Sequence, residues 1–277
     1  MTHEEYRWTT FDGVPIYART WKPQGTARAV VALIHGLGDH SGRYPWLVEG
    51  LTAGGCAVSA FDRRGEGKSG GPRTHTPSYD ALLRDIDQHL ANTRERFPGL
   101  PLVMYGHSFG GQQTLYYLLK RRPSVAAVVA SSPALASGVP QSGVKVAAGR
   151  LMAGLAPAVL FPTGTPLSSL SHDEGWIQTT LADPFFTDKV SARLGILLLD
   201  IGKWVLSQPE IPPVPLLIMQ GTDDQHADPK VNIEFAGRLR GDVTLKVWEG
   251  LGHELHNEVK RAEVLAYVAG WMSQHLK

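Results

Sequence analysis

The sequence has little cysteine, little net charge and no long apolar run. The single cysteine among 277 residues, Cys56, excludes an intrachain disulfide, and its apolar surroundings predict a small core residue. The formal net charge is +1, which gives no indication of a nucleic-acid partner. No run approaches the ~18 to 20 apolar residues of a membrane span, and the first residues do not resemble a signal peptide. We therefore expect a cytoplasmic protein, with peripheral contact at membranes left open.

What is present is a serine between glycines at the end of a strand-like run. Residues 102–105 are apolar, Gly106-x-Ser108-x-Gly110 follows at once, and a helical stretch covers 112–120. This is the nucleophile-elbow pattern, in which a strained strand-to-helix turn needs neighbours with almost no side chain. The N-terminus of the following helix then faces negative charge that develops during a reaction. The pattern predicts Ser108 as a nucleophile.

Strand-like and helix-like segments alternate along both ends of the chain. A hairpin is expected around Asp12-Gly13. The further expected strands are 29–34, 56–61, 102–105, 125–130, 214–220 and 243–248, and the expected helices of the same parts are 45–53, 79–97, 112–120 and 258–275. Such alternation predicts an α/β fold with a mostly parallel central sheet covered by helices on both faces.

The alternation stops between residues 134 and 213. Only two apolar or amphipathic helices are expected there, at 144–160 and 194–206, among Pro, Gly and Ser. We expect residues 1–133 and 214–277 to form the core domain and 134–213 to form an inserted helical cap, or lid.

A serine hydroxyl needs a base, usually a histidine that a carboxylate orients. In folds with this elbow the acid and then the histidine follow the serine, each at the end of a strand. The strand ending at 220 leads to Asp223 and Asp224, and the strand ending at 248 leads to His253. We expect Ser108, Asp224 and His253 to form the catalytic triad. The alternatives that remain are Asp223 and Asp228 for the acid and His226 and His256 for the base.

The tetrahedral intermediate also needs an oxyanion hole. One backbone N–H should come from Phe109, the residue after the nucleophile, and another from the loop after strand 29–34. In His35-Gly36-Leu37-Gly38 the best candidate is the N–H of Leu37.

Three rival motifs lack part of their context. The G-x-G-x-x-G of residues 65–70 does not open directly into a helix, as a dinucleotide site requires. Gly67-Lys68-Ser69 lacks the first glycine of a phosphate-binding loop, where Asp62 stands. His253-Glu254-Leu255-His256 is one residue short of the zinc-binding H-E-x-x-H. We expect neither a cofactor nor a metal.

Taken together, these motifs resemble the α/β-hydrolase superfamily, and within it the monoacylglycerol lipase and lysophospholipase-like group of serine hydrolases. The likeness covers nearly the whole length. The matching segments are 35–44 (the oxyanion segment), 62–69 (a structural turn), 97–101 with 106–111 (the elbow), Asp183-Pro184, 221–224 and 252–258. Asp224 falls on the catalytic position of the acid motif, whereas the group often has Met where Phe109 stands. The cap is the least similar part.

The resemblance implies a serine ester hydrolase that releases fatty acid and glycerol from monoacylglycerols. Other acyl esters, as for a general carboxylesterase or a lysophospholipase, are the alternative substrates. An acyltransferase, a non-catalytic binding protein and a serine aminopeptidase also stay open, the last because Asp173, Glu174 or Asp183 in the cap could bind a substrate amine. The oligomeric state is not predicted.

The cap segment 144–156 is apolar with two cations. It is either a helix packed over the core or the wall of an acyl-chain tunnel that also makes transient contact with lipid surfaces. In the second case Met152, Leu155 and Leu160 would contact the substrate.

Overall fold

The computed structural model describes residues 1–139 and 141–276, and its centre is an eight-stranded sheet. The strands are β1 (Thr2–Thr9), β2 (Pro15–Lys22), β3 (Ala29–Ile34), β4 (Cys56–Phe61), β5 (Leu102–His107), β6 (Ala127–Ser131), β9 (Leu216–Gly221) and β10 (Val243–Trp248). They lie in the order β1-β2-β4-β3-β5-β6-β9-β10. The pairs β1–β2 and β2–β4 are antiparallel, and all other neighbours are parallel. The mostly parallel sheet expected from the sequence is confirmed.

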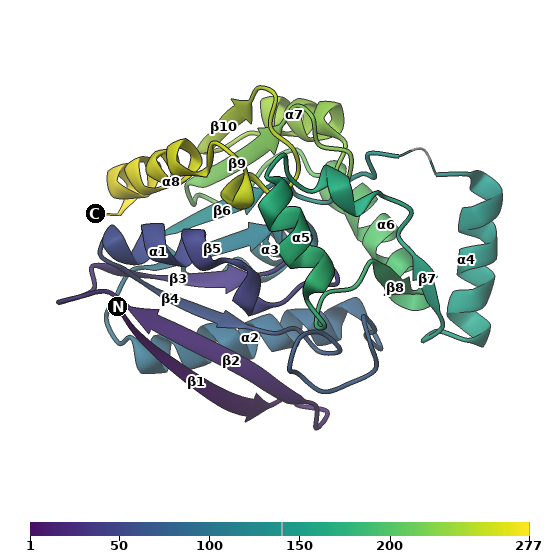
Figure 1. Cartoon of the computed structure of the whole chain (residues 1–277), viewed down its shortest axis with the longest axis horizontal. Coiled ribbons are helices and arrows are strands. Elements are labelled where there is room, and N and C mark those ends of the chain that lie inside the picture. The colour runs from purple at the N-terminus through teal and green to yellow at the C-terminus, as the bar shows by residue number, and fades with distance from the viewer. Residues whose placement is uncertain (140, 277) are drawn as a thin grey trace.

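Helices cover both faces of this sheet (Figure 1). On one face lie α1 (Pro45–Ala53) and α8 (Arg261–His275), and on the other lie α2 (Tyr79–Arg96), α3 (Phe109–Arg121) and α7 (Pro229–Arg238). Successive residues of β3 point to opposite faces, so Val31 and Leu33 pack with α1 and α8 while Val30 and Ala32 pack with the other layer. This double burial explains why the central strands read as continuous apolar runs.

The chain between β6 and β9 forms the layer above the carboxyl ends of the central strands. It contains α4 (Gly143–Leu155), β7 (Leu160–Pro162), α5 (Glu174–Ala182), β8 (Lys189–Ser191) and α6 (Ala192–Leu206). Helix α4 packs on α6, which in turn packs on α3, and Figure 1 shows α4 at the outer edge of the molecule. No helix within the described residues is long and apolar enough to cross a membrane.

The expected helix 144–160 was wrong at its C-terminal end. Helix α4 stops at Leu155, and Leu160 begins β7, which pairs antiparallel with β8. Pro157 explains the early end, because its ring disfavours a helical residue before it and it has no N–H to donate. Helix α8 likewise begins at Arg261, after a 3₁₀ turn at Leu255–Asn257, and not at residue 258.

Two helices were not expected, α5 and α7. The Asp173 side chain accepts from the N–H of Trp176 at the start of α5, and the Asp228 side chain accepts from the N–H groups of Lys230 and Val231 at the start of α7. Asp228 followed by Pro229 is an N-cap with proline at the first helical position, a signal that could have predicted α7.

Candidate active site

The serine of the elbow sits in a strained backbone conformation. Ser108 has φ 55° and ψ −118°, between the last residue of β5 and the first of α3. Side chains on its neighbours are excluded on both sides: a Cβ on Gly106 would collide with the carbonyl oxygen of Gly110, and one on Gly110 with that of Ile34. A non-glycine residue with positive φ persists only where the surroundings enforce it, which is common at functional sites.

A chain of two hydrogen bonds connects the serine to a buried carboxylate. The Nε2 atom of His253 lies 2.8 Å from Oγ of Ser108, and Nδ1 of the same ring lies 2.8 Å from Oδ2 of Asp224. Because an ionised carboxylate only accepts, Nδ1 carries the ring hydrogen of the neutral imidazole and Nε2 accepts from the serine hydroxyl. The structure therefore brings the three predicted residues together in the arrangement that abstracts a proton from a serine.

The environment of Asp224 keeps its carboxylate ionised. Its Oδ1 accepts from the N–H groups of His226 (2.8 Å) and Ala227 (2.9 Å), and its Oδ2 accepts from Nε2 of Gln220 (3.0 Å). Burial opposes ionisation, but the charge and hydrogen bond of His253 with these donors lower the pKa of Asp224. The pKa of His253 is raised. Burial by itself would lower it, but the charge of Asp224 and its hydrogen bond to the ring outweigh the effect of burial.

The other candidate acids point elsewhere. Asp223 is exposed, and its carboxylate accepts from the hydroxyl of Thr222. Asp228 caps helix α7. In the part of the chain that the structure describes, neither makes a hydrogen bond to His253, so the geometry separates Asp224 from its neighbours.

Two histidine rings pack on His253, and a third histidine packs on one of these. The ring of His226 stacks on His253 at 4.9 Å, and that of His107 lies 4.9 Å away in a tilted arrangement. The ring of His256 contacts His107 and stacks on Tyr44. Burial lowers the pKa values of His226 and His256 to about 4, so both are neutral near pH 7 and add no charge beside the triad. The sequence offers His226 and His256 as alternative bases and gives no signal for the packing of His107 on His253.

The two candidate oxyanion donors lie on the loops that flank the serine. Phe109 is the first residue of α3, where an N–H has no partner within the helix. Leu37 follows Gly36, whose Cα is so close to the serine that an added Cβ would lie 3.5 Å from Cβ of Ser108. Within the described residues, neither the Leu37 N–H nor the Phe109 N–H has a hydrogen-bond acceptor. Both groups are therefore available to an oxyanion.

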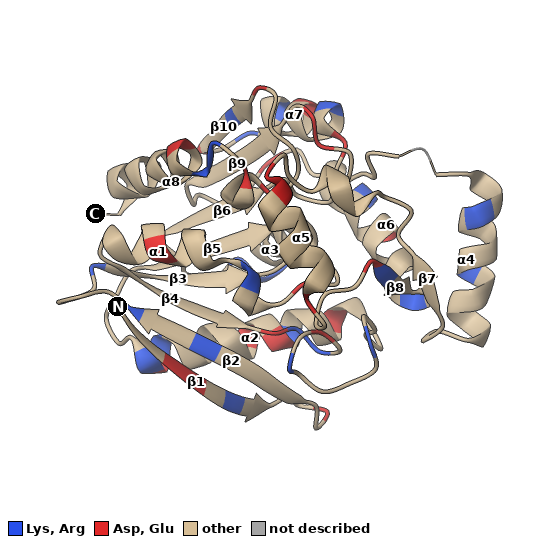
Figure 2. Ribbon diagram, viewed as in Figure 1, with Lys and Arg blue, Asp and Glu red and all other residues tan. Residues whose placement is uncertain are grey.

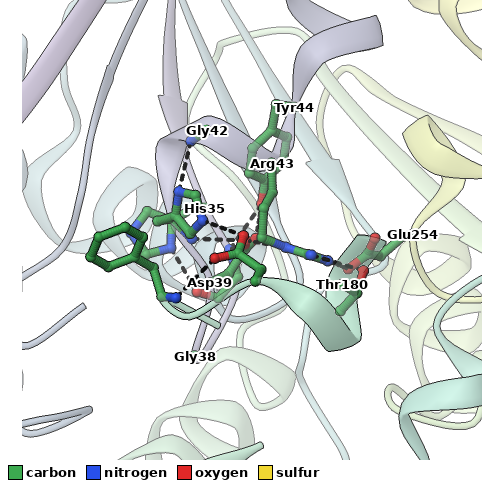
Figure 3. Close-up of polar contacts among 12 residues, drawn as sticks. His35, Gly38, Asp39, Gly42, Arg43, Tyr44, Thr180 and Glu254 are labelled. Atoms are coloured by element: carbon green, nitrogen blue, oxygen red, sulfur yellow. Dashed lines mark hydrogen bonds and ion pairs between the residues drawn. The ribbon is translucent and has the colours of Figure 1, made fainter. Parts of the chain in front are cut away.

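A buried ionic network supports the loop that carries Leu37 (Figure 3). The Arg43 guanidinium forms an ion pair with Asp39 Oδ1 (2.8 Å) and donates to Glu254 Oε1 (3.0 Å) and Thr180 Oγ1 (2.8 Å), so it joins that loop to the residue after His253 and to helix α5. Burial raises the pKa of Asp39, whereas the Arg43 charge overcomes the effect of burial on Glu254 and lowers its pKa to about 2. Sequence reasoning missed this network, although Arg43 and Asp39 belong to the segment 35–44 that carried the family resemblance.

The chain after α5 also rests on this loop. Asp183 Oδ2 lies 2.8 Å from Nε2 of His40, and the N–H of Thr187 donates to the carbonyl oxygen of Gly38 at 2.9 Å. The segment above the sheet is therefore hydrogen-bonded to the residues on both sides of Asp39.

The cap carboxylates considered for a substrate amine have other partners or face solvent. Asp173 caps α5 and pairs with Arg261 at 2.7 Å, Asp183 pairs with His40, and Glu174 is exposed. Among residues 1–139 and 141–276, none of the three makes a hydrogen bond to the triad.

The three predicted substrate-binding residues of the cap lie on α4 and β7. Met152 and Leu155 lie on α4, which packs on α6, and Leu155 is 75% exposed. Leu160 lies on β7 and is 36% exposed. Their contact with substrate stays a prediction.

Comparison with known proteins finds relatives that match almost the whole chain. A family model described as "serine aminopeptidase, S33" matches residues 25–260. An abhydrolase domain-containing protein of Dictyostelium discoideum is 34% identical over 100% of this chain, which spans only 30% of that longer protein. A monoacylglycerol lipase of Mycolicibacterium smegmatis is 31% identical, with 99% of each chain covered. The crystal structure of the Paleococcus ferrophilus monoacylglycerol lipase superposes with a TM-score of 0.84 at 28% identity, over 99% of this chain and 100% of the other.

Proposed function

The chain belongs to the α/β-hydrolase family described as serine aminopeptidase, S33, and we propose that it cleaves monoacylglycerols through an acyl-enzyme on Ser108. Its full-length similarity to monoacylglycerol lipases makes it a carboxylic ester hydrolase of that type. The products of the proposed reaction are a fatty acid and glycerol.

In the proposed mechanism the triad works in two half-reactions. Ser108 Oγ attacks the ester carbonyl carbon while His253 Nε2 takes the hydroxyl proton, and Asp224 stabilises the resulting imidazolium. The oxyanion accepts hydrogen bonds from the N–H groups of Leu37 and Phe109. As the tetrahedral intermediate collapses, His253 gives the proton to the leaving glycerol oxygen. The same base then activates water, which releases the fatty acid and restores the serine.

The observation that carries the proposal is the pair of 2.8 Å contacts that join Ser108 to His253 and His253 to Asp224. A strained serine, a base and an oriented carboxylate form a functional unit, and losing the serine alone removes most of the rate. The N–H groups of Leu37 and Phe109, which have no acceptor among the described residues, support the same reaction class, because acyl transfer builds negative charge on the carbonyl oxygen.

We also propose that the enzyme meets its substrate at a lipid surface through helix α4. Val144 and Leu151 on this helix are 80% and 62% exposed, and Leu155 points into solvent as well. Figure 2 shows only Lys and Arg among the charged positions of α4, and these are Lys145 and Arg150. Arg150 also pairs with Asp200 on α6. Exposed apolar side chains beside a cation such as Lys145 favour the surface of a bilayer that contains anionic lipid.

The test is glycerol release from a chain-length series of monoacylglycerols, measured beside short aryl esters, a lysophospholipid, a triacylglycerol and an amino-acid amide. The Ser108→Ala variant is the blank, and we expect its activity to be lower by on the order of 10⁴-fold or more. Preference for medium or long monoacylglycerols is the expected result. Activity restricted to short esters would make the protein a general carboxylesterase. Cleavage of the amide alone would favour a peptidase and overturn the proposal.

A further inference from the structure

We propose that Arg63 is a positioning residue that aims and polarises the oxyanion-binding N–H of Leu37. The inference rests on the proposed function, because it concerns the oxyanion hole of that reaction. Arg63 lies in the loop after β4, is 2% exposed, and belongs to neither the triad nor its hydrogen-bond partners.

The guanidinium of Arg63 holds the carbonyl oxygens of the oxyanion loop. Its NH2 group donates to the carbonyl oxygens of His35 (2.6 Å) and Gly36 (2.8 Å), and its NH1 group reaches the Gly36 oxygen at 3.3 Å. The backbone N–H of Arg63 donates to Nε2 of His35 at 2.8 Å. The neutral His35 ring therefore carries its hydrogen on Nδ1, which lies 2.8 Å from the same Gly36 oxygen. One carbonyl oxygen thus receives hydrogen bonds from two side chains.

This carbonyl belongs to the same peptide group as the Leu37 N–H. The C=O and N–H of a trans peptide lie in one plane and point in opposite directions, so fixing the Gly36 oxygen fixes the direction of the Leu37 N–H. A positive charge at the oxygen also withdraws electron density from the amide and strengthens its N–H as a donor. Arg63 therefore acts on the oxyanion through the peptide, without touching the substrate.

The partner of Arg63 holds the next peptide group. Glu66 lies 3.3 Å from the Arg63 guanidinium, and its other oxygen accepts from the N–H of Gly38 at 2.5 Å. The Leu37–Gly38 peptide is thus held as well. Figure 3 labels His35 and Gly38, the residues before Gly36 and after Leu37, on this loop. The guanidinium also lies 4.5 Å from the ring centroid of Phe109, the residue with the second donor. One buried ion pair therefore contacts both sides of the oxyanion hole.

Stability alone does not account for such a pair, because replacing a buried ion pair by apolar residues is often neutral or stabilising. The arrangement makes sense if the pair preorganises the N–H groups for charge that develops only in the transition state. That role predicts an effect on kcat and not on KM.

The experiment compares Arg63→Gln and Arg63→Lys with the wild-type enzyme on a soluble ester. We expect Arg63→Gln to lower kcat by about tenfold to a hundredfold with KM within about twofold, which is less than the 10² to 10³ lost with a direct oxyanion donor. Arg63→Lys keeps the positive charge but loses the two-pronged guanidinium, so its kcat should lie between those of Arg63→Gln and the wild type. The matched control is Arg64→Lys, since Arg64 is equally buried but pairs with Asp85 and Asp12, away from the oxyanion loop.

A second substrate distinguishes aiming from a general loss of structure. In a thionoester the carbonyl oxygen is replaced by a larger sulfur that accepts hydrogen bonds weakly, so a well-aimed oxyanion hole discriminates against it. We expect the ester-to-thionoester ratio of kcat/KM to fall by at least about threefold in Arg63→Lys and by about tenfold in Arg63→Gln, and to stay at the wild-type value in Arg64→Lys.

An unchanged ratio in both Arg63 variants would overturn the inference and leave the proposed function standing. If Arg63→Gln does not fold, as judged by its thermal unfolding, Arg63→Lys decides alone. Loss of folding in both would assign Arg63 to stability and overturn the inference. Wild-type protein without any Ser108-dependent ester hydrolysis would overturn the proposed function and this inference together.

Discussion

Nδ1 of His253 lies 2.8 Å from Oδ2 of Asp224, whereas Asp223, one position earlier, is exposed and makes no hydrogen bond to the ring within the described residues. The two carboxylates are chemically identical, so only their burial and direction separate them. Asp224 is held by three further donors, which leaves its Oδ2 directed at the imidazole.

The first prediction uses this difference. Asp224→Asn should lower kcat by about 10⁴-fold, because the amide favours the wrong tautomer of His253 and no longer stabilises the imidazolium. Asp223→Asn is the matched control and should stay within about twofold of the wild-type rate. Steady-state hydrolysis of a soluble ester measures both. Equal losses in the two variants would contradict the assignment of Asp224.

The second prediction concerns pH. Because the pKa of His253 is raised above its ordinary value of about 6.5, the neutral base is lost as pH falls through a value above 6.5. The kcat/KM profile should therefore show an acidic limb with its midpoint above 6.5 and a plateau at higher pH. In the residual activity of Asp224→Asn the midpoint should move down, since the carboxylate that raises the pKa is gone. A wild-type midpoint below 6.5 would show that burial dominates.

The third prediction concerns stability. Arg43→Met leaves the buried carboxylates of Asp39 and Glu254 without their cation, and removing one partner of a buried ion pair costs about 3–5 kcal/mol of the free energy of unfolding. Arg240→Met removes the exposed pair with Glu210 and should cost less than about 1 kcal/mol. Urea unfolding followed by tryptophan fluorescence gives both values. Similar costs would mean that the Arg43 network contributes no more than a surface pair.

The fourth prediction concerns the lipid surface. The double variant Val144→Gln/Leu151→Gln should bind vesicles that contain anionic lipid less strongly in a flotation assay, because it removes exposed apolar side chains from α4. Its hydrolysis of a soluble short-chain ester should not change. Val259→Gln, at an exposed apolar position outside the cap, is the control and should float like the wild type. Equal flotation of all three proteins would refute docking through α4.

Local sequence patterns were sufficient to predict the central sheet and the elbow. Strands such as β3 and β5 are buried on both faces, and their sequences are therefore continuous apolar runs. The elbow is equally local, because the strained Ser108 requires glycines at fixed spacing on either side. The order of strand ends then led to His253 and Asp224 without coordinates.

Only the tertiary structure decided which distant groups meet. The contact between Ser108 and His253 joins residues 145 positions apart, and Arg43 reaches Glu254 across 211 positions. No periodicity of the sequence encodes contacts between such distant residues. The Arg43 network and the hydrogen bonds from Arg63 to the Gly36 carbonyl oxygen were therefore not predicted. The end of α4 and the short strands β7 and β8 depend on Pro157 and on pairing between segments, so the apolar pattern of 144–160 was misleading there. The sequence by itself thus determined the central strands and the serine turn, because both depend on short-range patterns. The tertiary structure decided which charged groups surround them and in which direction the peptide groups point, because these depend on packing between distant segments.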